Sequence, residues 1–331
     1  MADNYRGPAS NYPAGFNNVT LRGVPITQSH PGQVFWVGNS ATSVLPGHVG
    51  ASDNNPGTFA APFSTISYAV NTAATASRGD IVFVKPGHAE TITTATDMVL
   101  ATAGVAVIGL GSGSMRPTIT VSTANAATLA VTAANIALQN ILFLSTRATV
   151  TSAITVTGTA LAPGLIVDNC EFRDTSATLV FSAAVTTNAT ANNADGLTFT
   201  NNKIVSAGVA TATKTALNLV ADSDRMVVTD NSGASLQTTV AMLATTAATS
   251  HTNCYIARNR FSGAHTSTSL ACGISGTGTA WSGVAENNYF FTLAASTGIW
   301  IPVTTKLALF QNYSPIAGAY ATQGTLNPVA T

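Results

Sequence analysis

The chain is poor in charge. Charged side chains make up 8% of its 331 residues, against roughly 25% in an average soluble domain. Thirteen Lys and Arg residues balance thirteen Asp and Glu residues, so the formal net charge is +0. Nucleic acids and anionic membranes attract basic surfaces, and we expect neither as a partner. The hydrophobic fraction of 46% excludes an intrinsically disordered composition.

Cysteine and histidine are also scarce, and their spacing does not fit a metal site. The three cysteines are an odd number without metal-like spacing, so we expect free, buried thiols in a protein folded in a reducing cytosol. They are Cys170, Cys254 and Cys272. The five histidines, at positions 30, 48, 88, 251 and 265, also lack the spacing of metal ligands. We predict no metal and no cofactor.

Long apolar runs are absent. The most apolar stretch, Val99 to Gly111, contains Thr and three Gly and is shorter than the roughly 20 residues of a membrane-spanning helix. The first ten residues, MADNYRGPAS, have neither the basic nor the apolar region of a secretory signal. We therefore expect synthesis in the cytoplasm and no membrane span.

What the chain has in quantity is a repeat. GLIVDNCEFRD (164–174) is echoed by GLTFTNNKIVS (196–206), MVVTDNSGAS (226–235), CYIARNRFSG (254–263) and WSGVAENNYF (281–290). The last apolar residue before the Asn falls at Leu138, Val167, Phe199, Val228, Ile256, Val284 and Leu309, with spacings of 29, 32, 29, 28, 28 and 25. Val107 and Phe83 extend the series upstream less regularly. Such a period is typical of repeat architectures.

Each unit predicts short strands. Apolar and polar residues alternate with a period of two, which indicates strand rather than helix, and Gly, Ser, Asn and Thr between units favour turns. A unit of this length cannot bury its own apolar face, but stacked units can. The sequence therefore predicts an all-β protein, a parallel β-helix of about nine coils.

The Asn of each unit is interpreted as a structural corner. It lies three residues after the reference position in five units, at Asn202, Asn231, Asn259, Asn287 and Asn312, and two residues after it at Asn140 and Asn169. Asn tolerates the left-handed backbone of a sharp turn, and stacked Asn amides can form a hydrogen-bonded ladder. The apolar residue five positions after the reference position is expected to point inward, at Phe143, Phe172, Ile204, Phe261 and Tyr289.

A charged column precedes these corners. Asp230, Arg258, Glu286 and Gln311 occupy it, so stacking places Arg258 between two carboxylates. We interpret it as an exposed charge ladder, in which each pair contributes little to stability. The alternative is a catalytic carboxylate pair with an Arg.

The two ends of the chain differ from the repeat. Within 62–75, Ile66, Ala69, Val70 and Ala73 have helical spacing, with Ser64 or Thr65 as N-cap, and this helix would cover the open end of the stack. Residues 1–60 are predicted to be an extended arm and lead-in, 61–313 the cap and coils, and 314–331 a C-terminal strap. Segments of this composition are ordered only when a partner ties them down. The candidate partner-binding residues of the arm are Tyr5, Arg6, Tyr12, Phe16 and Arg22.

Two stretches carry a resemblance to known proteins. TISYAV with SRGDIVFVKPGHAETI, followed by GVAVIGLGSGSMRPTITV (104–121), resembles the cap and first coils of the pectate-lyase-like right-handed parallel β-helix superfamily. YPAGFNNVTLRGVPI followed by HPGQVFWVGNS resembles virion structural proteins of tailed phages with this fold. The resemblance implies a right-handed helix, a homotrimer and a place in the virion.

Enzymes of that superfamily use clustered acids, and here no cross-coil pair stands out. Asp168, Glu171 and Asp174 share one coil, and Asp222 and Asp224 occupy a loop. We therefore expect a non-enzymatic capsid decoration or cement protein on the phage head, with its arm on the major capsid protein. The alternative is a tailspike or tail fibre that binds or cleaves host surface polysaccharide. An ice-binding or adhesive solenoid would need an evenly spaced Thr array, and the unit length varies too much for that.

Overall fold

The computed structural model describes ten segments of the chain. They are residues 20–21, 24–25, 32–39, 47–157, 161–207, 214–235, 242–245, 249–263, 280–292 and 306–312. The statements below concern these residues.

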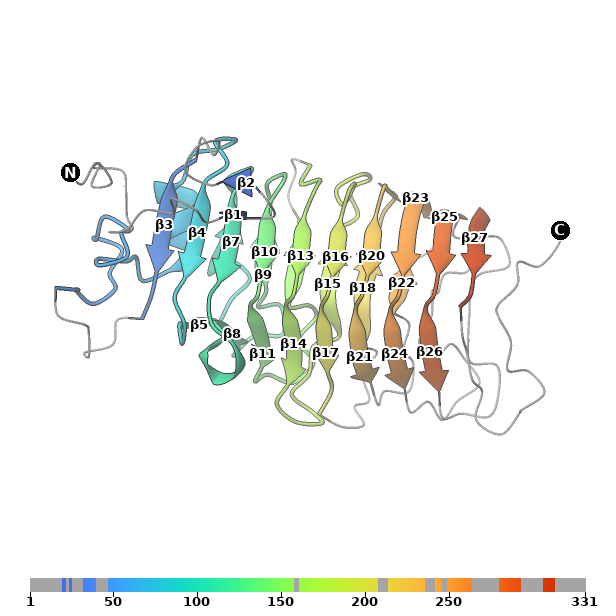
Figure 1. Ribbon diagram of the computed structural model, residues 1–331. Helices are drawn as coiled ribbons and strands as arrows, with labels where there is room; N and C mark the ends of the chain where they lie inside the picture. Colours follow the sequence, from blue (N-terminus) through green and yellow to red (C-terminus); the bar gives the residue numbers. More distant parts are fainter. Residues whose placement is uncertain are drawn as a thin grey trace.

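The described chain is a parallel β-solenoid (Figure 1). Successive strands of one coil belong to three different sheets, and each strand pairs in parallel with its counterpart in the next coil. β3 and β27 lie at opposite ends of the stack in Figure 1. Six coils contribute a strand to all three sheets, fewer than the nine expected from the repeat. The repeat counts only the first strand of each unit, and within the described residues the coils at both ends contribute strands to one or two of the sheets.

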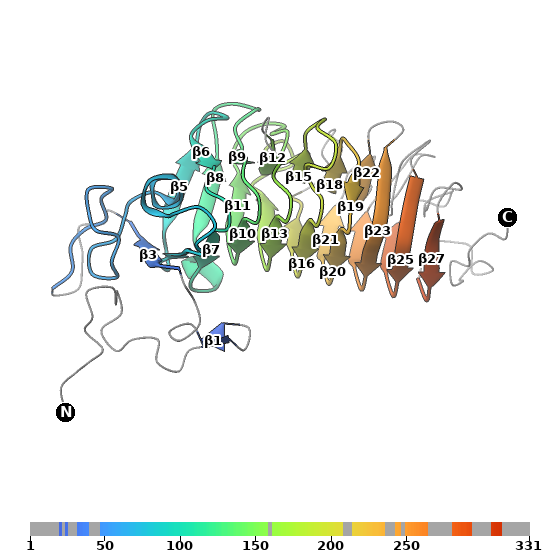
Figure 2. The same cartoon turned by 90° about the horizontal axis from the view of Figure 1, so that it is seen from above.

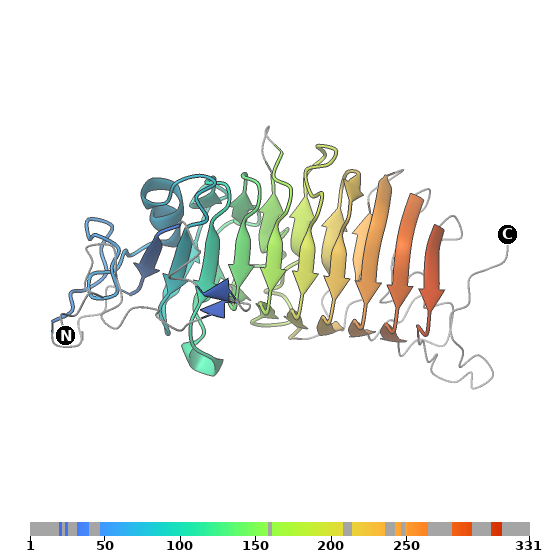
Figure 3. The same cartoon turned by 45° about the horizontal axis from the view of Figure 1, so that its top comes forward.

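The longest sheet has 11 strands and runs the length of the stack, as Figure 3 shows. Its strands are β3 (Val34–Val37), β4 (Ile81–Val84), β7 (Ala106–Gly109), β10 (Ala137–Gln139), β13 (Ile166–Asp168), β16 (Thr198–Thr200), β20 (Val227–Thr229), β23 (Ser250–Ala257), β25 (Ala280–Glu286) and β27 (Lys306–Phe310), with β19 (Ser223–Asp224) beside β23.

The other two parallel sheets are shorter and form the remaining walls (Figure 2). The 8-stranded sheet holds β5 (Ala89–Ile92), β8 (Thr118–Val121), β11 (Leu142–Ser145), β14 (Glu171–Asp174), β17 (Lys203–Val205), β21 (Ser232–Ser235), β24 (Arg260–Gly263) and β26 (Tyr289–Thr292). The 6-stranded sheet holds β6 (Met98–Leu100), β9 (Leu129–Val131), β12 (Ile154–Val156), β15 (Ala183–Thr187), β18 (Thr215–Leu219) and β22 (Leu243–Thr245).

Short elements complete the description. β1 (Thr20–Leu21) and β2 (Val24–Pro25) pair antiparallel, and η2 (Gly113–Met115) is one 3₁₀ turn. The predicted capping helix is present as α2 (Ile66–Tyr68), which continues as the π-helix η1 (Ala69–Ala73). The hydroxyl of Thr65 accepts a hydrogen bond from the Tyr68 N–H, so Thr65 is the N-cap.

One apolar core fills the stack from the capping helix to the last described strands. The capping helix contributes Ile66, Ala69 and Val70, all buried. Phe143 and Phe172, at equivalent positions of neighbouring coils, stack with ring centroids 5.1 Å apart and an interplanar angle of 7°. Equivalent side chains meet because the coils are in register. Each coil therefore buries its apolar side chains against those of its neighbours, which a single unit could not do alone.

The register confirms most of the reference positions of the repeat. Leu138 pairs with Val167, Phe199 with Val228, and Val228 with Ile256. The next partner, however, is Ala285 and not Val284. Val284 faces outward and is half-buried, whereas Ala285 is buried. Both are apolar, so the sequence pattern did not decide between them.

The same one-residue shift occurs later in that unit and in a unit far upstream. Phe290, not Tyr289, is the inward side chain of β26, and Tyr289 is exposed. Upstream, Val107 pairs with Val82 rather than with Phe83. In each case an apolar neighbour satisfied the alternation equally well, and a shift by one residue changes which side chain faces the core.

A buried asparagine column runs along the corner between the 11-stranded and the 8-stranded sheets. Its members are Asn202, Asn231, Asn259, Asn288 and Asn312, each at most 1% exposed. The prediction of Asn287 as the fourth member is wrong: Asn287 is exposed, and the ladder passes through its neighbour Asn288.

The four members from Asn202 to Asn288 make the same bonds, and Asn312, the last member in the described residues, donates to the Ala285 carbonyl. Asn259 Nδ2 donates to the Val228 carbonyl (2.8 Å) and to Asn288 Oδ1 (2.9 Å), and its backbone N–H donates to the same Oδ1 (3.1 Å). Asn231 in turn donates to Asn259 Oδ1 through its backbone N–H (3.1 Å) and Nδ2 (2.9 Å). Each amide therefore satisfies backbone groups at a corner that is closed to water, where an unpaired group costs about 1–3 kcal/mol.

The left-handed turn of each corner belongs to the preceding residue. A corner column with φ between 46° and 60° consists of Asn140, Asn169, Asn201, Asp230, Arg258, Asn287 and Gln311. Asn140, Asn169 and Asn287 therefore adopt the expected left-handed backbone, whereas the buried ladder residues Asn202, Asn231, Asn259 and Asn312 do not. The two roles are separate: one residue turns the chain, and the next forms hydrogen bonds with the buried backbone groups of the corner.

We predict that Asn259→Ala lowers the free energy of unfolding by about 3 kcal/mol, because it leaves the buried Val228 carbonyl and the Asn231 donors without their partner. The matched control is Asn287→Gly, since Gly adopts positive φ readily and Asn287 is exposed. We expect the control to change stability by less than about 1 kcal/mol. Urea unfolding followed by circular dichroism measures both, and equal losses would contradict the assignment.

Candidate functional site

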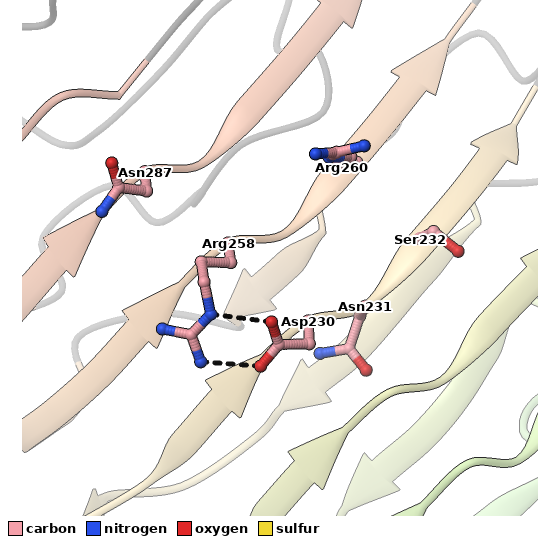
Figure 4. Close-up of a pocket in the computed structure, with 6 residues that line it drawn as sticks. All are labelled: Asp230, Asn231, Ser232, Arg258, Arg260 and Asn287. Atoms are coloured by element: carbon pink, nitrogen blue, oxygen red, sulfur yellow. Dashed lines mark hydrogen bonds and ion pairs between the residues drawn. The ribbon is translucent and has the colours of Figure 1, made fainter.

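The candidate site is a hollow at the corner between the 11-stranded and the 8-stranded sheets (Figure 4). Its volume is about 460 Å³, within the range of small-molecule sites. It is lined by Asp230, Asn231, Ser232, Arg258, Arg260 and Asn287. An adjoining hollow of about 350 Å³ shares Ser232 and Arg260 and adds Lys203 with the rest of β17.

The strand register places the basic residues on the outer face. Lys203 pairs with Ser232, and Ser232 pairs with Arg260. Each is the first residue of its strand, and the second, such as Ile204 or Phe261, is buried. Side chains alternate along a strand, so these three first residues form one outward row on β17, β21 and β24.

Arg258 and Asp230 form a bidentate ion pair in the hollow. Arg258 Nε and Nη2 each donate to one carboxylate oxygen of Asp230 at 2.7 Å, and Figure 4 shows the two side chains turned toward each other from neighbouring coils. These bonds hold the pKa of Asp230 below its ordinary value. A carboxylate that stays ionised at neutral pH cannot serve as a general acid.

The charge of the hollow is positive. Together with the adjoining hollow, it is lined by three cations, Lys203, Arg258 and Arg260, and by one carboxylate, Asp230. The nearest carboxylates beyond it are engaged elsewhere. Glu171, one coil from Lys203, accepts from Arg116 and Arg173, and Glu286 accepts from the Tyr255 hydroxyl. With hydroxyl and amide donors beside the cations, the hollow can bind an anion.

The predicted charged column is found only in part. Asp230, Arg258 and Gln311 share a column, but its member between the last two is Asn287, not Glu286. Glu286 is the last residue of β25 and pairs with Ala257. Arg258 therefore does not join two carboxylates: its guanidinium bonds Asp230, and a longer contact of 3.5 Å leads to the Tyr255 hydroxyl.

The acids considered for catalysis all have partners. Thirteen acids occur in the chain, and all except Asp3 lie in the described segments. Each of these twelve accepts at least one hydrogen bond from the chain itself: Asp53, Asp80, Glu90, Asp97, Asp168, Glu171, Asp174, Asp195, Asp222, Asp224, Asp230 and Glu286. Within the described segments, no three His, Cys, Asp or Glu residues form a group that could hold a metal ion.

Asp174 has a partner that the sequence did not predict. It forms an ion pair with Lys214, and both side chains are buried, at 0% and 2% exposed. Burial lowers the pKa of Lys214, and the charge of Asp174 partly opposes this effect. Asp174 ends β14, whereas Lys214 precedes β18 in the next coil. The register partner of Asp174 is Ser145, which carries no charge, so no recurring charge marks the pair in the repeat.

His251 is the buried group closest in type to a catalytic residue. Its Nδ1 lies 2.8 Å from Ser223 Oγ, its Nε2 lies 3.0 Å from Thr249 Oγ1, and its ring packs on Trp281. Burial lowers the pKa of His251 to about 4. The residue is 0% exposed, so no substrate reaches it, and its role is structural. Cys170 and Cys254 are likewise buried free thiols, with their pKa raised by burial to about 12.

The arm residues proposed for partner binding, Tyr5, Arg6, Tyr12, Phe16 and Arg22, lie outside the described residues, as does the strap 314–331. So do Cys272, His30 and His265. Within the described part, no helix has the length and hydrophobicity needed to span a bilayer.

The structure adds the row of Lys203, Ser232 and Arg260 to the sites expected from the sequence. All three lie four residues after the reference positions Phe199, Val228 and Ile256. The repeat alignment therefore contains this signal, but the search for acids and metal ligands did not examine it.

Comparison with known proteins gives no match: no protein-family model, no curated protein and no solved structure matches this chain. The structure supports the fold implied by the resemblance, a parallel β-solenoid. The likeness to phage virion proteins rests on the sequence motifs alone.

We predict that His251 makes stability depend on pH. Its pKa in the folded chain, about 4, is below the ordinary 6.5. The unfolded state therefore binds more protons between these pH values, and stability falls as the pH is lowered through that window. The expected loss from this group is about 3 kcal/mol. His251→Asn should flatten the dependence of the urea midpoint between pH 6.5 and 4, and an unchanged slope would contradict the assignment.

Proposed function

We propose that the chain is a non-enzymatic structural protein of a tailed-phage virion, a trimeric decoration or cement protein on the capsid. In this proposal the N-terminal arm contacts the major capsid protein and the coils project from the particle.

The observation that carries the proposal is the division of the chain into two contrasting parts. The coils pair their strands in continuous parallel ladders, and the asparagine column bonds buried backbone carbonyls at one corner. Residues 1–31 have a different composition, rich in Pro, Gly and Asn with scattered aromatics. A rigid stack with a separate attachment segment suits a protein that fastens to a surface and has no reaction to perform.

The state of the carboxylates agrees with a role that is not catalytic. Glycoside hydrolysis needs two carboxyl groups about 5–10 Å apart, one as acid and the other as base or nucleophile. In the described segments, every carboxylate already accepts hydrogen bonds from the chain, and Asp230, the one in the hollow, is bound on both oxygens by Arg258. Motifs of the first ~110 residues supply the link to phage virions.

The alternative is a tailspike or tail-fibre protein that binds or cleaves host surface polysaccharide. The hollow at Arg258 and Arg260 favours this alternative because it could hold part of an acidic glycan. Incubation of the purified chain with host capsule or lipopolysaccharide tests it, and released oligosaccharide would replace the first proposal with an enzymatic one.

Copy number separates the two locations. Quantitative mass spectrometry of purified virions should find hundreds of copies of the chain per particle if it decorates the head. A handful of copies would place it on the tail, and its absence from the particle would overturn both proposals.

We predict that the joint replacement of Tyr5, Arg6, Tyr12, Phe16 and Arg22 by Ala abolishes attachment to capsids that lack the protein, because these residues supply the apolar and charged contacts of the arm. Co-sedimentation with such capsids measures attachment. Circular dichroism should show an unchanged coil stack, since none of the five residues belongs to the described coils. Attachment equal to that of the unmodified chain would exclude the arm as the contact.

A further inference from the structure

Two basic side chains of the two hollows, Lys203 and Arg260, have no ion-pair partner within the described segments. Of the thirteen Lys and Arg residues, all except Arg6 and Arg22 lie in the described segments. Six of the described eleven form ion pairs with acids: Arg78, Arg116, Arg173, Lys214, Arg225 and Arg258. Lys85 donates to the Phe59 carbonyl and Arg147 to the Asn125 amide oxygen. Lys203, Arg260 and Lys306 make no such contact within the described segments.

Lys203 and Arg260 share one place in the fold. Both are exposed and outward-facing, and both line the adjoining hollow of about 350 Å³. Ser232 lies between them in the register, so their backbones are two strand spacings apart, about 9.6 Å. Both side chains are long enough to approach a group seated over Ser232 from its two sides.

The surroundings add donors without neutralising the two cations. The Ser232 hydroxyl is exposed between them, and the Asn287 amide lies in the same hollow as Arg260. Asp230 is the only carboxylate among the lining residues of the described hollows, and Arg258 occupies both of its oxygens. Glu171 is the register neighbour of Lys203 on β14 and is paired with Arg116 and Arg173, so the carboxylates nearest to the row each have an arginine partner.

This arrangement fits a tetrahedral oxyanion better than a carboxylate. A planar carboxylate is satisfied by one guanidinium in a bidentate contact, as Asp230 is by Arg258. A phosphate group presents further oxygens in other directions, so it can accept from a guanidinium on one side, an ammonium on the other and a hydroxyl beneath. Two uncompensated cations also match its charge of about −2 near neutral pH.

We propose that the row Lys203, Ser232 and Arg260 is a binding site for a phosphate group. Arg260 contacts the group through its planar set of N–H donors, Lys203 approaches as a point charge, and Ser232 donates its hydroxyl. This inference concerns the chain in solution and does not depend on the proposed location on a capsid.

The test measures binding of inorganic phosphate to the full-length chain by isothermal titration calorimetry at low ionic strength. We expect saturable binding with a dissociation constant in the millimolar range. A Kd of about 1 mM corresponds to a binding free energy of about −4 kcal/mol. The double variant Lys203→Gln with Arg260→Gln should weaken binding at least about tenfold. The matched control is Lys306→Gln, which removes an exposed, uncommitted cation from β27 and should leave the affinity unchanged.

Further arms identify the source of the phosphate group. Glucose 6-phosphate binding more tightly than inorganic phosphate, with no binding of glucose, would indicate a phosphorylated saccharide, and equal affinities would indicate free phosphate. The proposal is overturned if binding is not saturable, or if Lys306→Gln weakens it as much as the double variant. Circular dichroism of all variants confirms that the coils remain folded, which is expected because the replaced side chains are exposed.

Discussion

The constraint on which the whole structure depends is the corner between the two longer sheets. There each coil must turn sharply while its backbone groups stay buried in the wall. The chain meets this demand with two adjacent residues. The first adopts the left-handed backbone, which costs a non-glycine residue about 1–2 kcal/mol. The second, an Asn in five successive coils, offsets that cost because its side chain bonds backbone groups of the preceding coil, while the N–H of an internal member donates to the amide oxygen of the next Asn. Because every coil turns at the same place, equivalent side chains stack and close the core.

The sequence was sufficient to predict the fold class, but it was insufficient to predict the register of individual units, that is, which residues face the core. Period-two alternation and recurring corners define parallel strands wherever one apolar residue is flanked by polar ones, as around Phe199. The register is ambiguous where two candidates stand side by side. Asn287 and Asn288 are both suited to a corner, and Val284 and Ala285 are both apolar, so composition cannot say which faces inward. Pairing with the previous coil resolves the choice.

In the candidate site and its surroundings, contacts between equivalent positions of the repeat could be predicted from the sequence, and contacts between other positions could not. Arg258 and Asp230 occupy equivalent positions one coil apart, so stacking alone predicted that they would be neighbours. Lys203 and Arg260 are equally periodic, and an alignment read for cations would have found them. The contact of Lys214 with Asp174 is different, since the two residues occupy unrelated places in their coils. Such a contact depends on how a loop crosses the end of the core, and no local pattern encodes it.

The uniform bonding of the asparagine column has a consequence for how such a chain can change its length. An internal member such as Asn231 or Asn259 accepts from the member before it and donates to the one after it. If a whole unit were removed or copied, the two newly adjacent asparagines would find the partners they had before. Tandem duplication or deletion of a unit therefore leaves no unmatched buried amide. The protein can be lengthened or shortened in evolution by recombination at unit boundaries, without invention of new contacts.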